Sequence, residues 1–150
     1  MAAPEPLPPL AAEAPYVLED QVGHLLRRAH QRATQVFLEG IGQPPLTPTQ
    51  FAALIKVGDL GEVSQNHLGR LTAMDPATSQ GVIRRLVAAG LVERRASATD
   101  KRRAMLRLTA AGDAAAALGR VVGRAISAAT LAPLSPREQA AFLALLKRMI

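Results

Sequence analysis

The chain contains no cysteine. Disulfide bonds, catalysis by a thiolate and thiol-based peroxide sensing are therefore excluded. Aromatic residues are scarce as well, because the 150 residues include three phenylalanines, one tyrosine and no tryptophan. Most of the apolar content comes instead from alanine, leucine and valine, a composition that favours a helical fold over a sandwich or a barrel. At this length the chain suits one domain with a substantial hydrophobic core.

Long hydrophobic runs are also missing. No uncharged apolar run reaches 18 residues, and the long uncharged stretch at residues 40–55 contains three prolines, which prevent a membrane-spanning helix. The N-terminus has no basic-then-apolar signal pattern, and five prolines fall within its first 15 residues. We therefore expect residues 1–16 to form a disordered Pro/Ala-rich arm and the protein to be cytoplasmic.

Positive charge is concentrated in one part of the chain. Between residues 84 and 107, eight basic residues face only Glu93 and Asp100, a net charge of +6 that equals the formal net charge of the whole chain. A basic block on an otherwise neutral protein is typical of nucleic-acid binding, although charge alone also fits a solvated basic hairpin. The eight basic residues are Arg84, Arg85, Arg94, Arg95, Lys101, Arg102, Arg103 and Arg107.

Helical periodicity marks the first third of the chain. Apolar residues at three- and four-residue spacings predict a helix over residues 17–38, ended by the glycines and prolines that follow it. A capping box at Thr47, with a proline at the first helical position, predicts a second helix. We expect this helix to end near Val57, because Gly58 and Gly61 follow.

Two shorter helices are predicted in the middle of the chain. Ser64 is placed to cap a helix over residues 65–71. Asp75, followed by a proline, starts another helix that ends near Ala89, with Gly90 as its C-terminal stop. Two short helices joined by a turn of three or four residues form a helix-turn-helix.

A basic hairpin follows this pair of helices. Residues 91–95 and 103–108 are predicted to be strands on either side of a polar loop at residues 96–102. A helix-turn-helix followed by a hairpin is a winged helix. The predicted fold is therefore mainly α with a small β-hairpin wing, a winged helix-turn-helix with N- and C-terminal dimerisation helices.

The C-terminal third is predicted to be helical again. Thr109 caps a long Ala-rich helix that ends near Leu131, and a second capping box at Ser135 opens a last helix that runs to Met149. Together with the first helix, these two helices carry more apolar surface than a compact winged helix can bury. The composition therefore predicts a homodimer.

The second helix of the helix-turn-helix divides into two faces, with Thr78 and Gln80 on the flanks of the exposed one. The amide of Gln80 suits bidentate pairing with adenine, the guanidinium of Arg84 or Arg85 suits guanine, and the hydroxyl of Thr78 suits a phosphate. A helical wheel predicts a buried face formed by Ser79, Val82, Ile83, Leu86 and Val87, and an opposite face formed by Ala77, Gly81, Arg84, Arg85 and Ala88.

Gly81 lies inside this helix, where glycine costs about 1 kcal/mol relative to alanine. Its place at the centre of the exposed face indicates that something approaches the backbone closely there, and the floor of a DNA major groove fits. The alternative is that Gly81 relieves crowding against another helix.

Two stretches near the hairpin carry a family resemblance. One is Asp100-x-Arg102, a strand and then Leu-Thr-x-x-Gly at residues 108–112; the other is Leu-Val-Ala-Ala-Gly-Leu-Val-Glu-Arg at residues 86–94. Both resemble the wing region of the MarR family of bacterial transcription regulators, and the helix order extends the resemblance over residues 17–150. The resemblance implies an obligate homodimer with interlocking terminal helices. It also implies that Asp100 pairs with an arginine to hold the wing and that Arg102 enters the minor groove.

The resemblance assigns a role to each part of the chain. It implies a single MarR-like domain at residues 17–150, with the winged helix at about residues 47–109 and dimerisation helices at about residues 17–40 and 110–150. A two-fold dimer is expected to bind a near-palindromic site on double-stranded DNA, with its recognition helices about 34 Å apart.

The expected DNA interface combines the helix-turn-helix with the wing. The family commonly has a larger polar residue at the positions of Ala77 and Gly81, a difference that concerns base reading rather than the docking mode. Asp100 is expected to structure the wing. The residues expected to contact DNA are Thr78, Ser79, Gln80, Gly81, Arg84, Arg85, Arg94, Arg95, Lys101, Arg102 and Arg103.

A small-molecule site is expected on the first helix. His24 and Arg28 belong to a polar stripe beside the apolar one, and a solvated helix face is the alternative explanation of that stripe. Residues 21–32 resemble regulators of nicotinate degradation, which respond to hydroxynicotinate. The resemblance implies a small aromatic carboxylate effector, such as 6-hydroxynicotinate, between the dimer helices and the DNA-binding lobe. The residues expected to bind it are His24, Arg27, Arg28 and Phe51.

These features favour a ligand-responsive, DNA-binding transcriptional regulator that acts as a repressor. A ligand-independent or architectural DNA-binding protein is the alternative, and it would have the same wing but no affinity for aromatic acids. The chain is not expected to be an enzyme, since it has no phosphate-binding glycine loop, zinc motif or nucleophile elbow. No cofactor or metal site is expected either, because the three histidines include no pair at a helical four-residue spacing and cysteine is absent.

Overall fold

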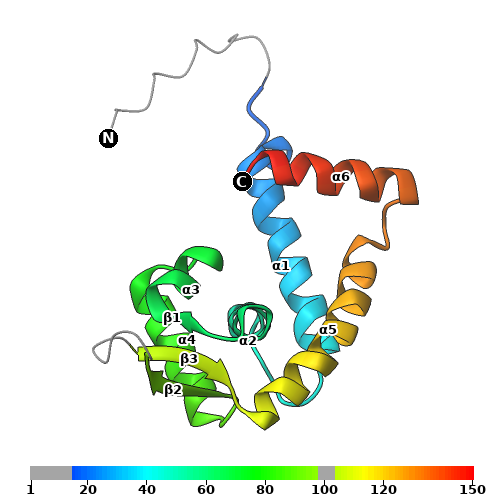
Figure 1. Cartoon of the computed structure of the whole chain (residues 1–150). Helices are drawn as coiled ribbons and strands as arrows, with labels where there is room; N and C mark the ends of the chain where they lie inside the picture. Colours follow the sequence, from blue (N-terminus) through cyan, green and yellow to red (C-terminus); the bar gives the residue numbers. More distant parts are fainter. Residues whose placement is uncertain (1–14, 98–103) are drawn as a thin grey trace, which may run out of the picture.

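The computed structural model describes residues 15–97 and 104–150. Figure 1 shows two parts: α2, α3, α4 and the sheet form one compact lobe, here called the winged-helix lobe, while α1, α5 and α6 extend away from it and are called the helical arms. Residues 1–14 of the expected N-terminal arm lie outside the described residues. After a 3₁₀ turn (Leu18–Asp20), the elements are α1 (Val22–Gly40), α2 (Pro48–Leu60), β1 (Val63–Ser64), α3 (Gln65–Leu71), α4 (Pro76–Ala88), β2 (Val92–Ala96), β3 (Ala104–Leu108), α5 (Ala110–Leu131) and α6 (Pro136–Arg148).

Side-chain caps set the first residues of the helices. At the start of α2 the capping box is present, because Thr47 Oγ1 accepts a hydrogen bond from the Gln50 amide at 3.2 Å and Gln50 Oε1 accepts one from the Thr47 amide at 2.9 Å. Asp75 caps α4 and Thr109 caps α5, each by accepting the backbone N–H three residues further on, at 2.9 Å and 3.0 Å. The predicted starts of these three helices are therefore confirmed.

Three details at helix ends differ from the sequence-based expectation. The helix expected from residue 17 begins only at Val22, because Gln21 has extended backbone (ψ 130°) and separates a 3₁₀ turn from α1. The last helix ends at Arg148, one residue earlier than expected. Val87, expected on the buried face of α4, is 36% exposed in the last turn of that helix.

The end of α2 also differs. The helix continues past Val57 to Leu60, so Gly58 does not break it. A Cβ at Gly58 would lie 2.9 Å from Leu108 Cδ1, so the bare backbone permits close packing of α2 against β3. Gly61, with φ +71°, ends the helix in a conformation that other residues adopt at a cost.

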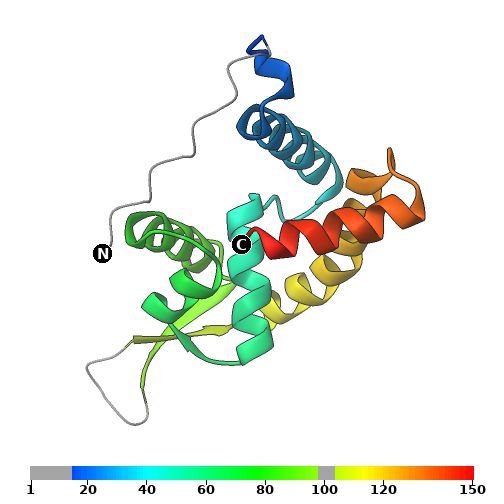
Figure 2. The same ribbon diagram turned by 90° about the horizontal axis from the view of Figure 1, so that it is seen from above.

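The sheet has three antiparallel strands in the order β1-β3-β2. The β2–β3 hairpin was predicted, whereas β1 was not, because two residues are too short to show an alternating pattern. Val63 of β1 lies opposite Leu106, and Val92 of β2 lies opposite Leu108. The hairpin points away from α1 and α6 both in Figure 1 and in the view from above in Figure 2.

A tight joint connects the end of α4 with the start of α5. Thr109 Oγ1 donates a hydrogen bond to the Gly90 carbonyl at 2.6 Å, and the Thr109 amide donates to the Leu91 carbonyl at 3.1 Å. A Cβ on Gly112 would lie only 1.9 Å from the Leu91 oxygen, so only glycine fits there. The Leu-Thr-x-x-Gly motif is therefore the joint that fixes the second helix of the helix-turn-helix to the long arm helix.

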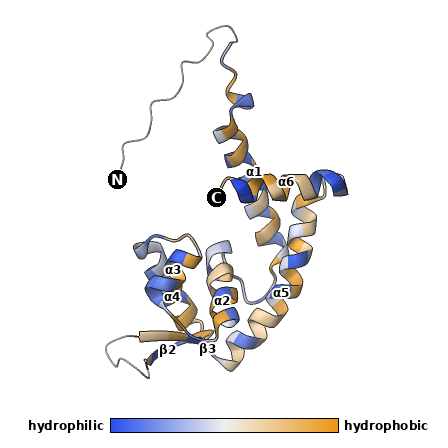
Figure 3. Cartoon of the chain, turned by 45° about the horizontal axis from the view of Figure 1, so that its top comes forward, coloured by the Kyte–Doolittle hydropathy of each residue, from blue (hydrophilic) through white to orange (hydrophobic). Residues whose placement is uncertain are grey.

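The helical arms bury little of their apolar surface. Phe37 is the one buried residue of α1, and α6 has none. By length and composition α5 is apolar enough to cross a membrane, but only 17% of its most apolar 18-residue window is buried. Figure 3 shows hydrophobic colour along both α1 and α6. Exposed apolar side chains of the arms include Val22, Leu25, Leu26, Leu118, Val121, Phe142, Leu143 and Leu145.

Candidate nucleic-acid interface

The exposed face of α4 has the polar side chains that the helical wheel predicts. Gln80, Arg84 and Arg85 are exposed, while Val82, Ile83 and Leu86 on the opposite face are 1–3% exposed and pack into the core. The cap at Asp75 and the positive φ of Gly90 (+69°) bound the helix at its two ends. The lobe thus presents one amide and two guanidinium groups from a rigid helix, side chains that suit major-groove base edges.

Gly81 faces open space at the centre of this exposed face. A Cβ built there would meet nothing within 4 Å. The alternative explanation, that Gly81 relieves crowding against another helix, is therefore wrong for the described chain. The described chain therefore gives no packing reason for a glycine at this position, and the expected approach of DNA stays a prediction.

Thr78 is exposed but hydrogen-bonded within the chain, and Ser79 is buried, so neither side chain is placed as a free DNA contact. The Thr78 hydroxyl donates to Asp75 Oδ2 at 2.6 Å and the Thr78 amide donates to Asp75 Oδ1 at 2.9 Å. These two hydrogen bonds, first the one from the hydroxyl, hold the pKa of Asp75 below its ordinary value. Ser79 is 3% exposed, as the wheel predicts, so it lies on the wrong side of α4 to read a base.

The base of the wing is basic and contacts α3. Arg94 and Arg95 are both exposed on β2. Arg95 Nε pairs with Glu93 Oε1 at 2.6 Å, and Arg94 donates to Gln65 Oε1 on α3 at 3.5 Å. Sequence reasoning missed the proximity of α3 to the wing, since 29 residues separate the two partners. The tip residues Asp100, Lys101, Arg102 and Arg103 lie outside the described residues.

The residues expected to bind a small molecule do not converge within one chain. His24, Arg27 and Arg28 lie in the first half of α1, where Arg27 contacts His24 Nδ1 at 3.4 Å. Phe51 lies on α2 and packs edge-on against Phe37, with ring centroids 5.4 Å apart. Thirteen residues of helix separate His24 from Phe37, which corresponds to roughly 20 Å. The described chain therefore does not bring all four residues together at one site.

Phe51 lines a shallow, open depression between α2 and α5 that the sequence did not reveal. Arg120 and Arg124 of α5 also line it. A Cβ on Gly119 or Gly123 would come within 2.9–3.0 Å of the Phe51 ring, so these glycines let the ring lie flush against α5. Arg120 also pairs with Asp59 at 2.7 Å. Two guanidinium groups beside an aromatic ring provide the groups that an aromatic carboxylate needs.

Three comparisons with known proteins agree with the fold described above. The sequence model of the MarR family matches residues 45–103. The transcriptional repressor NicR of Pseudomonas putida is 40% identical over 138 residues, which cover 91% of this chain and 86% of the relative.

Two solved structures resemble about nine-tenths of the chain. A probable transcriptional regulator from Pseudomonas aeruginosa has 48% sequence identity and a TM-score of 0.85, covering 89% of this chain and 100% of the other. BpsR of Bordetella bronchiseptica has 37% identity and a TM-score of 0.84, covering 91% of this chain and 97% of the other. The BpsR structure concerns the mechanism by which 6-hydroxynicotinic acid regulates its DNA binding. These relatives are transcription regulators, in agreement with the expectation that the chain is not an enzyme.

Proposed function

The chain belongs to the MarR family of transcription regulators, and on this premise we propose that it is a cytoplasmic repressor that binds double-stranded DNA as a homodimer and is released by a small aromatic acid. The observation that carries the proposal is the similarity to NicR and BpsR over about nine-tenths of the chain. The exposed amide and guanidinium groups of α4 support it independently, because they suit the major groove.

The proposed homodimer is supported by the uncovered apolar surface of the arms. A groove of about 580 Å³ runs between α1, α5 and α6 and is lined mostly by apolar side chains, Leu26, Ile126 and Phe142 among them. Apolar surface of this extent is typical of an interface. With a two-fold dimer the two α4 helices would enter successive major grooves, about 34 Å apart, on a near-palindromic site.

The proposed effector site is shared between the two subunits. The ring of the acid would lie in the open depression beside Phe51, with Arg120 or Arg124 facing its carboxylate. His24 and Arg28 of the partner subunit would close the site and bond the ring hydroxyl or nitrogen. Of the aromatic acids, 6-hydroxynicotinate is the one we favour, since residues 21–32 resemble regulators that respond to it and BpsR is regulated by it.

Fluorescence anisotropy on DNA from upstream of the protein's own coding sequence tests both the proposed DNA binding and its proposed release by an aromatic acid. We expect salt-dependent binding that 6-hydroxynicotinate reverses, with benzoate and uncharged nicotinamide as comparison ligands. Binding that no aromatic acid reverses at millimolar concentration would leave the ligand-independent DNA-binding protein as the function. Arg102→Ala is expected to weaken binding and flatten the salt slope by about one unit; unchanged affinity would refute the assignment of the wing.

A further inference from the structure

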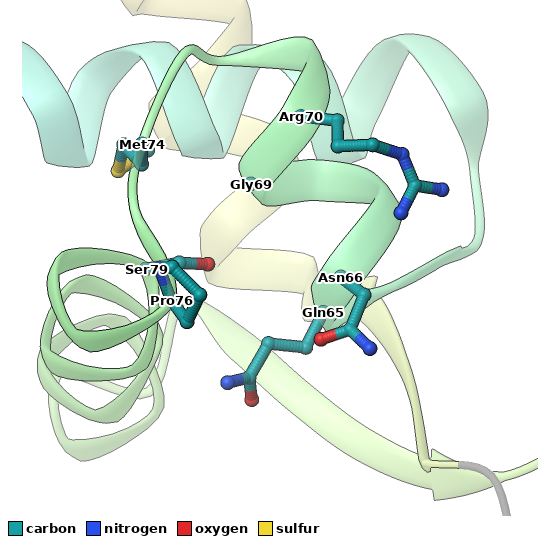
Figure 4. Close-up of a pocket in the computed structure, with 7 residues that line it drawn as sticks. All are labelled: Gln65, Asn66, Gly69, Arg70, Met74, Pro76 and Ser79. Atoms are coloured by element: carbon teal, nitrogen blue, oxygen red, sulfur yellow. The ribbon is translucent and has the colours of Figure 1, made fainter. Parts of the chain in front are cut away.

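Two hollows of the described chain differ in whether they can respond to pH. The hollow between α3 and α4 has a volume of about 280 Å³ and is lined by Gln65, Asn66 and Arg70 of α3 and by Ser79 of α4. In Figure 4 the Arg70 guanidinium points away from Ser79, so one small ligand does not reach both. None of the side chains that line this hollow changes its charge near neutral pH, whereas the groove of the arms contains one that does.

His30 is the one ionisable side chain among the described residues that line the groove between α1, α5 and α6. The α5 side of the groove consists of Ser127, Thr130 and apolar residues, and the α6 side consists of Phe142, Leu143 and Leu146, none of which titrates. His30 is exposed in the single chain. Its imidazole therefore stays in contact with water until something covers the groove.

The charges close to His30 along α1 are positive. Arg27 lies one turn earlier on the same side of the helix, and its guanidinium contacts His24 Nδ1 at 3.4 Å. Arg28 and Arg32 lie two residues away on either side of His30, so they project from other faces of the helix. Among the described residues that line the groove there is no carboxylate. The described groove therefore offers no compensation for a protonated imidazole.

In the proposed homodimer, the arms of a second copy cover this groove. Two-fold symmetry brings the same helices to it, so the carboxylates of the arms are the groups that could compensate the charge. Glu39 and Glu138 each accept a hydrogen bond within their own chain, while Glu19 and Asp20 lie in the 3₁₀ turn before α1. Covering the groove removes His30 from water, and burial among apolar side chains disfavours the charged form of an imidazole.

We propose that His30 makes the homodimer sensitive to mild acid: the dimer forms with a neutral imidazole in the groove, and protonation separates the subunits. The proposal rests on the homodimer proposed above and adds a form of regulation that needs no aromatic acid. Because the dimer favours the neutral form, its full stability is present above the range in which imidazoles titrate, roughly pH 6.5, and is lost as the pH falls through that range. Mild acid would thereby release a DNA site that needs two α4 helices.

Sedimentation velocity of the full-length protein at pH 7.5 and pH 5.5 tests the proposal, with circular dichroism to show that the separated subunits stay folded. The dimer dissociation constant of the wild type should rise by up to about a hundredfold at the lower pH, about tenfold for each of the two imidazoles. His30→Gln, which is polar and uncharged, should keep the dissociation constant at pH 7.5 within severalfold and remove most of the rise. His67→Gln removes an exposed imidazole from α3 and is the matched control, so it should show the full rise.

A second variant, His30→Leu, suits the apolar lining and should give a dimer that does not respond to pH in this range. An equal rise for the wild type and His30→Gln would overturn the proposal, as would a wild-type dimer with the same dissociation constant at both pH values. A dimer that tightens in acid would also overturn it, because a carboxylate of the partner would then face His30. A wild type that stays monomeric at every pH and concentration refutes the proposed homodimer instead.

Discussion

In the winged-helix lobe, the largest side chains that are less than 2% exposed include Leu54, Leu68 and Leu106, one from each of three elements that are distant in sequence. In the helical arms, α6 buries nothing and α1 buries only Phe37. Both parts are rich in leucine and alanine, so composition does not explain the difference. The core of the lobe is complete within one chain, with Phe37 of α1 and Ala116 and Ile126 of α5 as part of it, whereas the outer parts of the arms leave an apolar groove open between α1, α5 and α6.

This difference separates two sources of stability. Burial inside the lobe is complete in one chain, so its contribution should not depend on protein concentration. Burial of the arms requires a partner, so their contribution should rise with concentration if the proposed dimer forms. The joint at Thr109 and Gly112 connects the two parts rigidly, which means that a shift of the arms would reach α4.

The largest expected effect comes from Leu86→Ala in the core of the lobe. Leu86 is 1% exposed, so the truncation should lower the free energy of unfolding by about 2–5 kcal/mol. Urea denaturation should show the same loss at every protein concentration. Leu145→Ala on α6, where the side chain is 56% exposed, is the comparison: in dilute protein its cost should stay within about 0.5 kcal/mol. Equal losses for both variants in dilute protein would contradict the division into two parts.

A charge placed in the groove of the arms should have the next largest effect. Leu143 is 42% exposed and lines the groove, so Leu143→Glu would bury an uncompensated carboxylate in the proposed dimer. We expect the dimer dissociation constant to rise at least about tenfold, or 1.4 kcal/mol, in sedimentation-velocity measurements. Lys147→Glu on the same helix is the control, since that position is already charged and exposed. Wild-type behaviour of Leu143→Glu would refute the groove as the dimer interface.

Local signals explain why most of the lobe could be predicted from the sequence. The starts of α3 and α4 follow from Ser64 and Asp75, whose side chains each accept the backbone N–H of the residue three positions further on, and the end of α4 follows from Gly90. Each signal acts within one turn of chain. The division of α4 into a buried and an exposed face was also predictable, because it depends only on helical periodicity.

Features that depend on distant residues were not predictable. β1 is a strand only because β3 lies beside it, and a glycine is needed inside α2 at position 58 because Leu108 of β3 occupies the space that a Cβ would take. The arginines beside Phe51 come from α5, so the depression between α2 and α5 has no signature along the chain. The hollow at Ser79 likewise arises from two helices that meet in space.

A third prediction addresses the ion pair that links the lobe to the arms outside the main joint. Asp59 on α2 pairs with Arg120 on α5 at 2.7 Å, with side chains 43% and 39% exposed. Exposed pairs of this kind contribute about 0.2–1 kcal/mol and are screened by salt. Asp59→Asn should therefore lower the Tm slightly at low salt and hardly at all in 1 M salt. The charge-swapped double variant Asp59→Arg with Arg120→Asp should recover the low-salt Tm; failure to do so would mean that packing, not charge, links the two helices.

The smallest expected effects concern two helix caps, one in each part. Hydrogen bonds from Thr78 hold the pKa of Asp75 below its ordinary 3.8, and hydrogen bonds from Ser135 hold the pKa of Glu138 below its ordinary 4.5. Because each pKa is lower in the folded state, each carboxylate stabilises the fold above its ordinary pKa, and that stabilisation is lost as the pH falls through the lowered value. Asp75→Asn and Glu138→Gln should therefore flatten the decline of Tm below about pH 4–4.5.

The two caps should differ in how this loss depends on protein concentration. Asp75 begins a helix whose buried face packs into a core that is complete within one chain, so Asp75→Asn should change the acid response equally in dilute and concentrated protein. Glu138 begins α6, which has no buried residue in the single chain, so the proposed dimer would couple its cap to association. Glu138→Gln should then alter the pH dependence of the dimer dissociation constant between pH 3 and 5, measured by sedimentation, while Asp75→Asn leaves it unchanged. An equal response of association to both variants would mean that acid weakens the dimer through the lobe and not through α6.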